Sequence, residues 1–166
     1  INANTGDGVI IVGDGVIGAS GALCAKARGF RTLLLGRHDS KLAKINALGV
    51  STANIKTVTQ DELSDFKPTA VIDTVQNPEA FEMYHRSLPA TWAAESFGNS
   101  RIGTGQIIYS GHTPDGIKSW ADMAHLQKQE LTVHFVSGWT KDRLIKTLAL
   151  MKTDQLSLEK LATEYQ

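Results

Sequence analysis

The stretch GVIIVGDGVIG, residues 8–18 of this 166-residue chain, decides its fold. An apolar run with strong β propensity leads directly into residues 17–28, whose apolar and small residues recur at helical spacing. Between the two lies a GxGxxG pattern formed by Gly13, Gly15 and Gly18. A lone pattern of this kind is weak evidence, but a strand before it and a helix after it are the context that a dinucleotide-binding turn requires.

Each glycine of this turn has a separate physical task. Gly13 permits the tight turn out of the strand, Gly15 lets a pyrophosphate approach the backbone, and Gly18 lets the helix pack closely on the sheet. The N–H groups and dipole of a helix that begins near Val16 favour an anionic diphosphate. Asp14 is an unexpected neighbour for a diphosphate, and we expect it to point to solvent or to hydrogen-bond within the turn. A tight turn without a ligand is the alternative. The residues predicted to bind a dinucleotide here are Gly13, Gly15, Val16, Ile17 and Gly18.

Apolar strands alternate with helical segments along the rest of the chain, which predicts parallel strands joined by crossover helices. The strands are continuously apolar, as expected when both faces of a sheet are covered. We therefore predict an α/β fold with a doubly wound, mostly parallel six-stranded sheet, the Rossmann fold. The expected strands are 8–13, 31–35, a weak one within 50–58, 69–75, 106–110 and 131–136. The expected helices are 17–28, one capped by Ser40 and ending at Gly49, 60–66, 79–88, 118–129 and 141–152.

The domain organisation follows from this pattern. Residues 1–166 are expected to form a single dinucleotide-binding domain. An irregular insertion at about 89–105 interrupts the alternation and is long for a connection between a helix and a strand. We expect Trp92 and Phe97 in this insertion either to close over a pocket or to pack on a neighbouring part. A polar C-terminal tail at about 156–166 is expected to be loosely held.

The residues after the second strand bear on the choice of cofactor. In NAD-binding domains an acidic residue at this position holds the adenosine ribose, but here Gly36 stands in its place. A glycine leaves room for a 2′-phosphate, and Arg37 can pair with that phosphate and stack on adenine. His38 and Lys41 add positive charge, whereas Asp39 either neutralises part of it or caps the next helix. We predict NADP(H) in preference to NAD(H), with a solvated basic turn as the alternative.

Ligands of doubly wound sheets lie at the carboxyl ends of the strands. Backbone groups at the later strand ends are therefore predicted to hold the nicotinamide carboxamide. These further candidates are Val75, Ser110, Gly111 and Val136. Asp73, inside a strand, is expected to be a structural hydrogen-bonding residue, and His112 to be polar rather than catalytic. No zinc-ligand spacing and no nucleophile–base pair is evident, so no metal site is predicted and the catalytic residues stay unknown.

Composition excludes several classes of function. Lys plus Arg and Asp plus Glu number 17 each, so the formal net charge is zero and a general nucleic-acid binder is disfavoured. The one cysteine, Cys24, excludes an internal disulfide framework and a cysteine-rich zinc site. No apolar run is long enough to span a bilayer, and no signal peptide is evident. We therefore expect a cytoplasmic protein that binds neither nucleic acid nor a membrane.

At this point the chain resembles a known family. GDGVIIVGDGVIGASGALCAKARGF followed by TLLLGRHDSKLAKINALGV is similar to the nucleotide-binding domain of medium-chain, zinc-type alcohol dehydrogenases and their quinone reductase relatives. The later segments VIDTVQNPEAF, IIYSG, QELTVHFVSGW and RLIKTLALMKTDQL also fit, so the resemblance covers nearly all of the chain outside 89–105. Many NADP(H)-dependent members of the family carry a small residue and an arginine where this chain has Gly36 and Arg37.

The resemblance implies an oxidoreductase that transfers hydride between an alcohol or carbonyl substrate and the nicotinamide. In that family a separate catalytic domain carries the substrate contacts and any zinc ligands, and nothing here matches it. The chain is thus expected to be an excised cofactor domain or a stand-alone descendant, and whether it is itself an enzyme stays open. The family also implies a homodimer through strand 131–136. The alternative is a non-enzymatic module with the same fold that senses a nucleotide or serves association.

Overall fold

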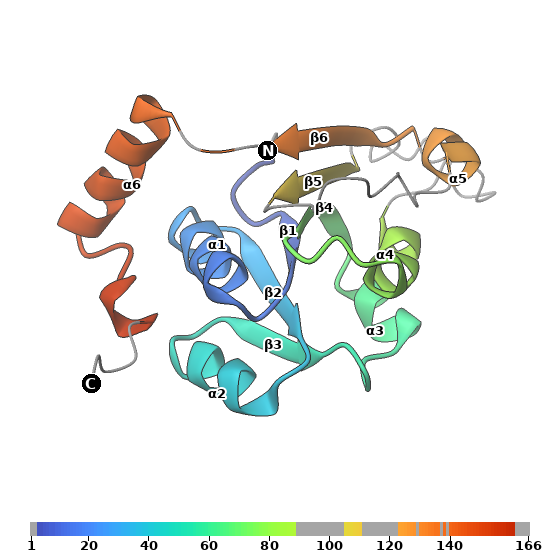
Figure 1. Ribbon diagram of the computed structural model, residues 1–166, viewed down its shortest axis with the longest axis horizontal. Helices are drawn as coiled ribbons and strands as arrows, with labels where there is room; N and C mark the ends of the chain where they lie inside the picture. The colour runs from blue at the N-terminus through green and yellow to red at the C-terminus, as the bar shows by residue number, and fades with distance from the viewer. Residues whose placement is uncertain are drawn as a thin grey trace.

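The computed structural model describes residues 3–88, 105–110, 123–128, 130–136, 138 and 140–161. Strands and helices alternate along these residues (Figure 1). The elements of the first half are β1 (Gly8–Val12), α1 (Val16–Ala27), β2 (Arg31–Gly36), α2 (Asp39–Ala47), β3 (Ser51–Asn54), α3 (Gln60–Asp65) and β4 (Pro68–Asp73). The later elements are α4 (Pro78–Tyr84), a 3-10 turn (His85–Ser87), β5 (Gln106–Ser110), α5 (Met123–Lys128), β6 (Thr132–Val136), α6 (Lys141–Lys152) and a second 3-10 turn (Glu159–Leu161).

The six strands form one sheet in the order β3-β2-β1-β4-β5-β6, and every neighbouring pair is parallel. This confirms the predicted doubly wound α/β fold. The chain runs outward from β1 to β3 and then returns to place β4 on the other side of β1. The strand order therefore reverses between β1 and β4, the place where sheets of this kind bind ligands. Val12, the last residue of β1, pairs with both Leu35 and Asp73, so these three strands end at one level.

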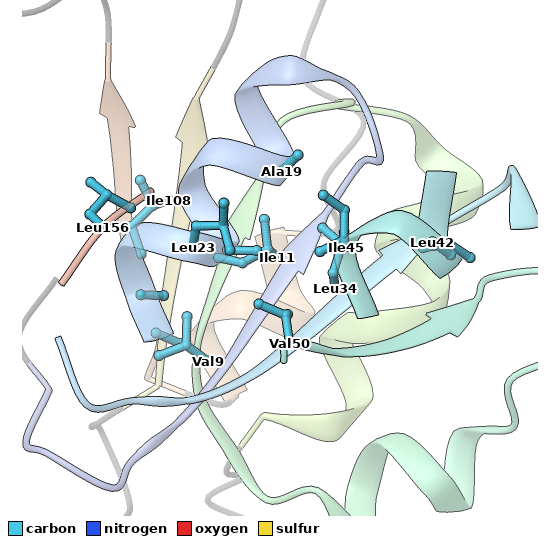
Figure 2. Close-up of a cluster of buried hydrophobic side chains, with 13 residues drawn as sticks. Val9, Ile11, Ala19, Leu23, Leu34, Leu42, Ile45, Val50, Ile108 and Leu156 are labelled. Carbon is cyan, nitrogen blue, oxygen red and sulfur yellow. The ribbon is translucent and has the colours of Figure 1, made fainter. Parts of the chain in front are cut away.

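Helices cover both faces of the sheet, with α1 and α2 on one side and α3 and α4 on the other (Figure 1). Side chains of β1 alternate between the two layers. Val9 and Ile11 belong to the hydrophobic cluster beneath α1 and α2, whereas Ile10 and Val12 belong to the cluster beneath α3 and α4. Figure 2 shows Ile11 lying beside Leu23 of α1 in the first cluster. Burial on both faces explains why β1 is continuously apolar.

Helix boundaries follow local chemistry, with one exception. Gly29 and Gly49 end α1 and α2 in the left-handed conformation, with φ of +79° and +80°. The α1 end is a Schellman motif, because Phe30 N–H donates to the Ala25 carbonyl. The expected Ser40 cap of α2 is wrong, because the helix begins at Asp39 with His38 as its N-cap and no side-chain capping bond.

The last strand and helix are less buried than the rest of the fold. β6 is an edge strand whose Phe135 is 81% exposed, and α6 has no buried residue. The polar tail is nevertheless held at Leu156, which is buried in the cluster beneath α1 (Figure 2). The rest of the tail beyond Leu161 and the insertion, apart from its last residue, lie outside the described residues. The helix expected over 118–129 is described only as α5.

We expect Leu34→Ala to lower the free energy of unfolding by about 2–5 kcal/mol, because Leu34 is fully buried in β2 and its truncation leaves a cavity. Urea unfolding followed by circular dichroism measures this change. The matched control is Leu148→Ala in α6, where the side chain is 52% exposed and the loss should stay within about 0.5 kcal/mol. Equal losses in the two variants would contradict the assignment of the core.

Candidate functional site

The glycine-rich turn between β1 and α1 brings two backbone segments into direct contact. A Cβ on Gly18 would overlap the carbonyl oxygen of Gly13. Gly13 has φ of +115°, and a Cβ there would clash with the Thr74 hydroxyl and lie 2.9 Å from Val75 Cγ2. The fold itself therefore requires glycine at 13 and 18. Gly15 differs, because a Cβ on it would meet nothing within 4 Å. The open side of Gly15 leaves its backbone accessible to a ligand.

A cleft of about 560 Å³ lies beside this turn, at the carboxyl ends of β1, β2 and β4. One wall is the first turn of α1, whose leading N–H groups have no partners within the helix and whose dipole favours an anion. Val16 and Ile17 are exposed on this wall at 80% and 55%. The predicted residues that line the cleft are Gly13, Gly15, Val16, Ile17, Gly18, Gly36, Arg37, His38 and Val75. Sequence reasoning did not single out other lining residues, among them Leu35, Ile55 and Ala80.

Asp14 does not behave as the sequence suggested. Its side chain is only 9% exposed and bonds across to the loop after β2, not within its own turn or to solvent. Oδ2 accepts the backbone N–H groups of Arg37 at 2.7 Å and His38 at 2.8 Å. The same oxygen lies 2.9 Å from His38 Nδ1, which must carry a proton because a carboxylate can only accept. Lys41 Nζ stands 3.9 Å from Oδ1.

Two opposing effects act on the Asp14 carboxyl group. Burial raises its pKa. The backbone N–H groups of His38 and Arg37, together with the His38 ring, lower its pKa by more than burial raises it. The net pKa therefore lies below the ordinary value for aspartate. Asp14 is consequently an anion at neutral pH, fixed at the rim of the cleft.

This carboxylate changes the interpretation of Gly36. A Cβ on Gly36 would lie 2.6 Å from Asp14 Cβ, 2.7 Å from Asp14 Oδ2 and 2.9 Å from Leu42 Cδ2. The space beside Gly36 is therefore filled by Asp14 and Leu42, and it is not the open room for a phosphate that the sequence suggested. Gly36 is needed so that the glycine-rich turn can approach the end of β2.

Arg37 holds its side chain in an ion pair across the cleft rim. Its Nη2 lies 3.1 Å from Oε2 of Glu79 in α4, and both side chains are largely solvent-accessible. An exposed pair of this kind contributes at most about 1 kcal/mol, so an incoming anion can compete for the guanidinium.

The wall at the end of β4 is held by a second buried carboxylate. Asp73 Oδ1 accepts the backbone N–H groups of Val75 and Gln76, each at 2.8 Å, and Oδ2 accepts the Tyr84 hydroxyl at 2.9 Å. Burial raises the pKa of Asp73, and the donors offset this only in part. Asp73 is thus the structural hydrogen-bonding residue that the sequence predicted, and it fixes the turn that carries Val75 into the cleft.

The candidates from the last two strands are not brought to this cleft. Ser110 and Val136 are register partners at the ends of β5 and β6, and neither lines the cleft. The Ser110 carbonyl accepts from Gln76 Nε2 at 3.5 Å, which links it to the turn after β4. Gly111, His112, Trp92 and Phe97 lie outside the described residues.

In the described part of the chain, no group of three or more His, Cys, Asp or Glu side chains could hold a metal ion. No described helix is both long and apolar enough to cross a membrane.

Comparison with known proteins shows a likeness in fold. No protein-family model and no curated protein sequence matches the chain. Among solved structures, benzyl alcohol dehydrogenase from Acinetobacter calcoaceticus is similar with a TM-score of 0.80 and 18% identity over 99% of this chain and 44% of that one. The 2R,3R-butanediol dehydrogenase of Bacillus subtilis gives a TM-score of 0.78 and 17% identity over 98% of this chain and 44% of that chain.

A third similar structure is a short chain alcohol dehydrogenase from Escherichia coli CFT073, complexed with cofactor NADH. Its TM-score is 0.74 at 18% identity, over 95% of this chain and 44% of that chain. This chain thus spans less than half the length of these dehydrogenases. At such low identity, the likeness establishes the Rossmann-like fold of the chain.

Alanine substitutions at Gly18 and at Gly15 are expected to differ in their effect on stability. We expect Gly18→Ala to lower the free energy of unfolding by about 1–3 kcal/mol, because its Cβ would overlap the Gly13 carbonyl and force the backbone apart. Gly15→Ala should change stability by about 0.5 kcal/mol or less, since its φ of −78° suits alanine and the space beside it is open. Denaturant unfolding of both variants tests this, and a larger loss in Gly15→Ala than in Gly18→Ala would refute the turn geometry.

Proposed function

We propose that the chain is the NADP(H)-binding domain of an oxidoreductase of the medium-chain alcohol dehydrogenase type. The observation that carries this proposal is the cleft at the reversal of strand order, with the α1 N-terminus and the open side of Gly15 facing it. Diphosphates bind in such a place because backbone N–H groups and the helix dipole stabilise their charge. The fold shared with dehydrogenases, one of them solved with NADH, supports the same conclusion.

The residues present fit a nicotinamide dinucleotide. Gly13, Gly15 and Gly18, with Val16 and Ile17, would hold the diphosphate at the start of α1. The loop from Gly36 to Lys41 would hold the adenosine end. The nicotinamide end would be held by backbone groups of Val75, Ser110, Gly111 and Val136.

The preference for NADP(H) over NAD(H) rests on the loop after β2. The sequence carries no acidic residue at the last position of that strand, and Arg37, His38 and Lys41 follow it. Arg37 can exchange its exposed pairing with Glu79 for a bidentate contact to a phosphate, which is the stronger interaction. The Asp14 carboxylate opposes this preference.

When bound, the nicotinamide would supply the hydride chemistry, and the residues of this chain would bind and orient it. An alcohol or carbonyl substrate would be positioned by a further domain outside this chain, and a catalytic zinc, where one is used, would be held there too. We further propose that two copies pair through β6, an edge strand whose Phe135 is largely exposed.

Isothermal titration of the chain with NADPH and with NADH tests the proposed function. We expect saturable binding of both dinucleotides with the lower Kd for NADPH. Gly15→Val serves as the matched control, because a branched side chain in the open space beside the turn should block the diphosphate of either cofactor while the fold persists. Failure of the unaltered chain to bind either dinucleotide would leave a module used for association as the better explanation of the fold.

We expect Arg37→Asp to weaken NADPH binding by about ten-fold or more and NADH binding only slightly. The substitution removes a charge-assisted contact to the 2′-phosphate and adds a like charge. Arg143→Asp in α6 is the control, because it makes the same change of charge away from the cleft. Equal losses of affinity for the two cofactors would contradict a contact between Arg37 and the 2′-phosphate.

A further inference from the structure

The donor groups of the loop after β2 already bind an anion, namely the carboxylate of Asp14. Consecutive backbone N–H groups of Arg37 and His38, together with the His38 ring, converge on one carboxylate oxygen of Asp14. Donor groups that converge on one point in this way suit an anion, because each donates to a negatively charged oxygen. The Asp14 carboxylate occupies this point and also stands where a side chain on residue 36 would begin.

From this geometry, and resting on the proposed function, we propose that Asp14 is a specificity-determining residue of the cleft. Its carboxylate occupies the anion position after β2 and thereby lowers the affinity for a 2′-phosphate relative to a 2′-hydroxyl. The glycine-rich turn would thus bind the diphosphate and also determine whether a ribose with a 2′-hydroxyl or one with a 2′-phosphate is preferred.

Asp14 disfavours the phosphate in two ways. It uses the two backbone donors that a 2′-phosphate would otherwise receive at this place. It also adds a negative charge in a largely buried position, where water screens repulsion less than at the surface. The phosphate would have to share Lys41 and His38 with this carboxylate.

A ribose hydroxyl meets no such opposition. Among the described residues, none donates a backbone hydrogen bond to Asp14 Oδ1, which lies 3.1 Å from His38 Nδ1 and 3.9 Å from Lys41 Nζ. A carboxylate oxygen has room for a further donor, and a hydroxyl can donate whereas an ionised phosphate can only accept. A carboxylate at this place thus serves the task of the acidic residue that NAD-binding domains carry at the end of the second strand.

A purely structural role for Asp14 predicts a different result. The carboxylate ties the glycine-rich turn to the loop after β2, so a loosened loop would weaken NADPH and NADH alike. Asp14→Asn separates the two roles, because the amide oxygen can still accept the N–H groups of Arg37 and His38 while the charge is lost. The ratio of the two affinities reports specificity, and thermal unfolding reports the structural contribution.

The experiment is calorimetric titration of the unaltered chain, Asp14→Asn, Asp14→Ser and the control Asp65→Asn with NADPH and NADH. Asp65 is exposed at the end of α3 and does not line the cleft, so its variant matches the charge change alone. We expect the ratio of NADH Kd to NADPH Kd to rise about ten-fold in Asp14→Asn through tighter NADPH binding. Asp14→Ser should change the ratio in the same direction, and Asp65→Asn should leave it unchanged.

The outcomes distinguish this inference from the function on which it rests. Binding of both dinucleotides with an unchanged ratio in both Asp14 variants, or with equal losses for both, would overturn the role in specificity and leave the proposed function standing. No binding of either dinucleotide by the unaltered chain would overturn the proposed function and the inference together. Asp14→Ser keeps the test decisive where Asp14→Asn does not fold.

Discussion

The close approach of α1 to the end of β1 is the constraint on which the rest of the cleft depends. The helix can begin where it does only because Gly18 has no side chain to meet the Gly13 carbonyl oxygen. Because α1 packs this closely, its N-terminus lies at the reversal of strand order between β1 and β4. A larger residue at 18 would push the helix outward, and its leading N–H groups would no longer line the cleft.

Two buried or nearly buried carboxylates fix the remaining walls, and each does so by accepting two backbone N–H groups. Asp73 orders the turn after β4, and Asp14 orders the loop after β2. Their electrostatic settings differ. The pKa of Asp73 is raised because burial outweighs its donors, which include Tyr84, whereas the donors around Asp14 outweigh burial and lower its pKa. Asp14 lines the cleft and Asp73 does not, so the carboxylate that faces a ligand is that of Asp14.

The sequence predicted the fold well because the signals for it are local. Continuous apolar runs identified the strands, and Gly29 and Gly49 marked the ends of two helices with the required positive φ. The start of α2 was misplaced, because Ser40 is a favoured cap residue but tertiary contacts of the preceding loop start the helix earlier. The start of the polar tail is buried at Leu156, an apolar residue of the cluster beneath α1.

The site was only partly predictable from the sequence, because it depends on a contact between two loops that are far apart along the chain. The rule that an acidic residue after the second strand binds the ribose refers to a position along the chain. Gly36 stands at that position, so the rule by itself argues against NAD(H). What a ligand meets is the position of a carboxylate in space, and Asp14 brings one to that place from 22 residues earlier. Only the packing of two loops reveals this substitution, since each loop by itself looks ordinary. The balance between the carboxylates of Asp14 and Glu79 and the cations Arg37 and Lys41 therefore sets the charge of the rim, and the presence or absence of an acid at one sequence position does not.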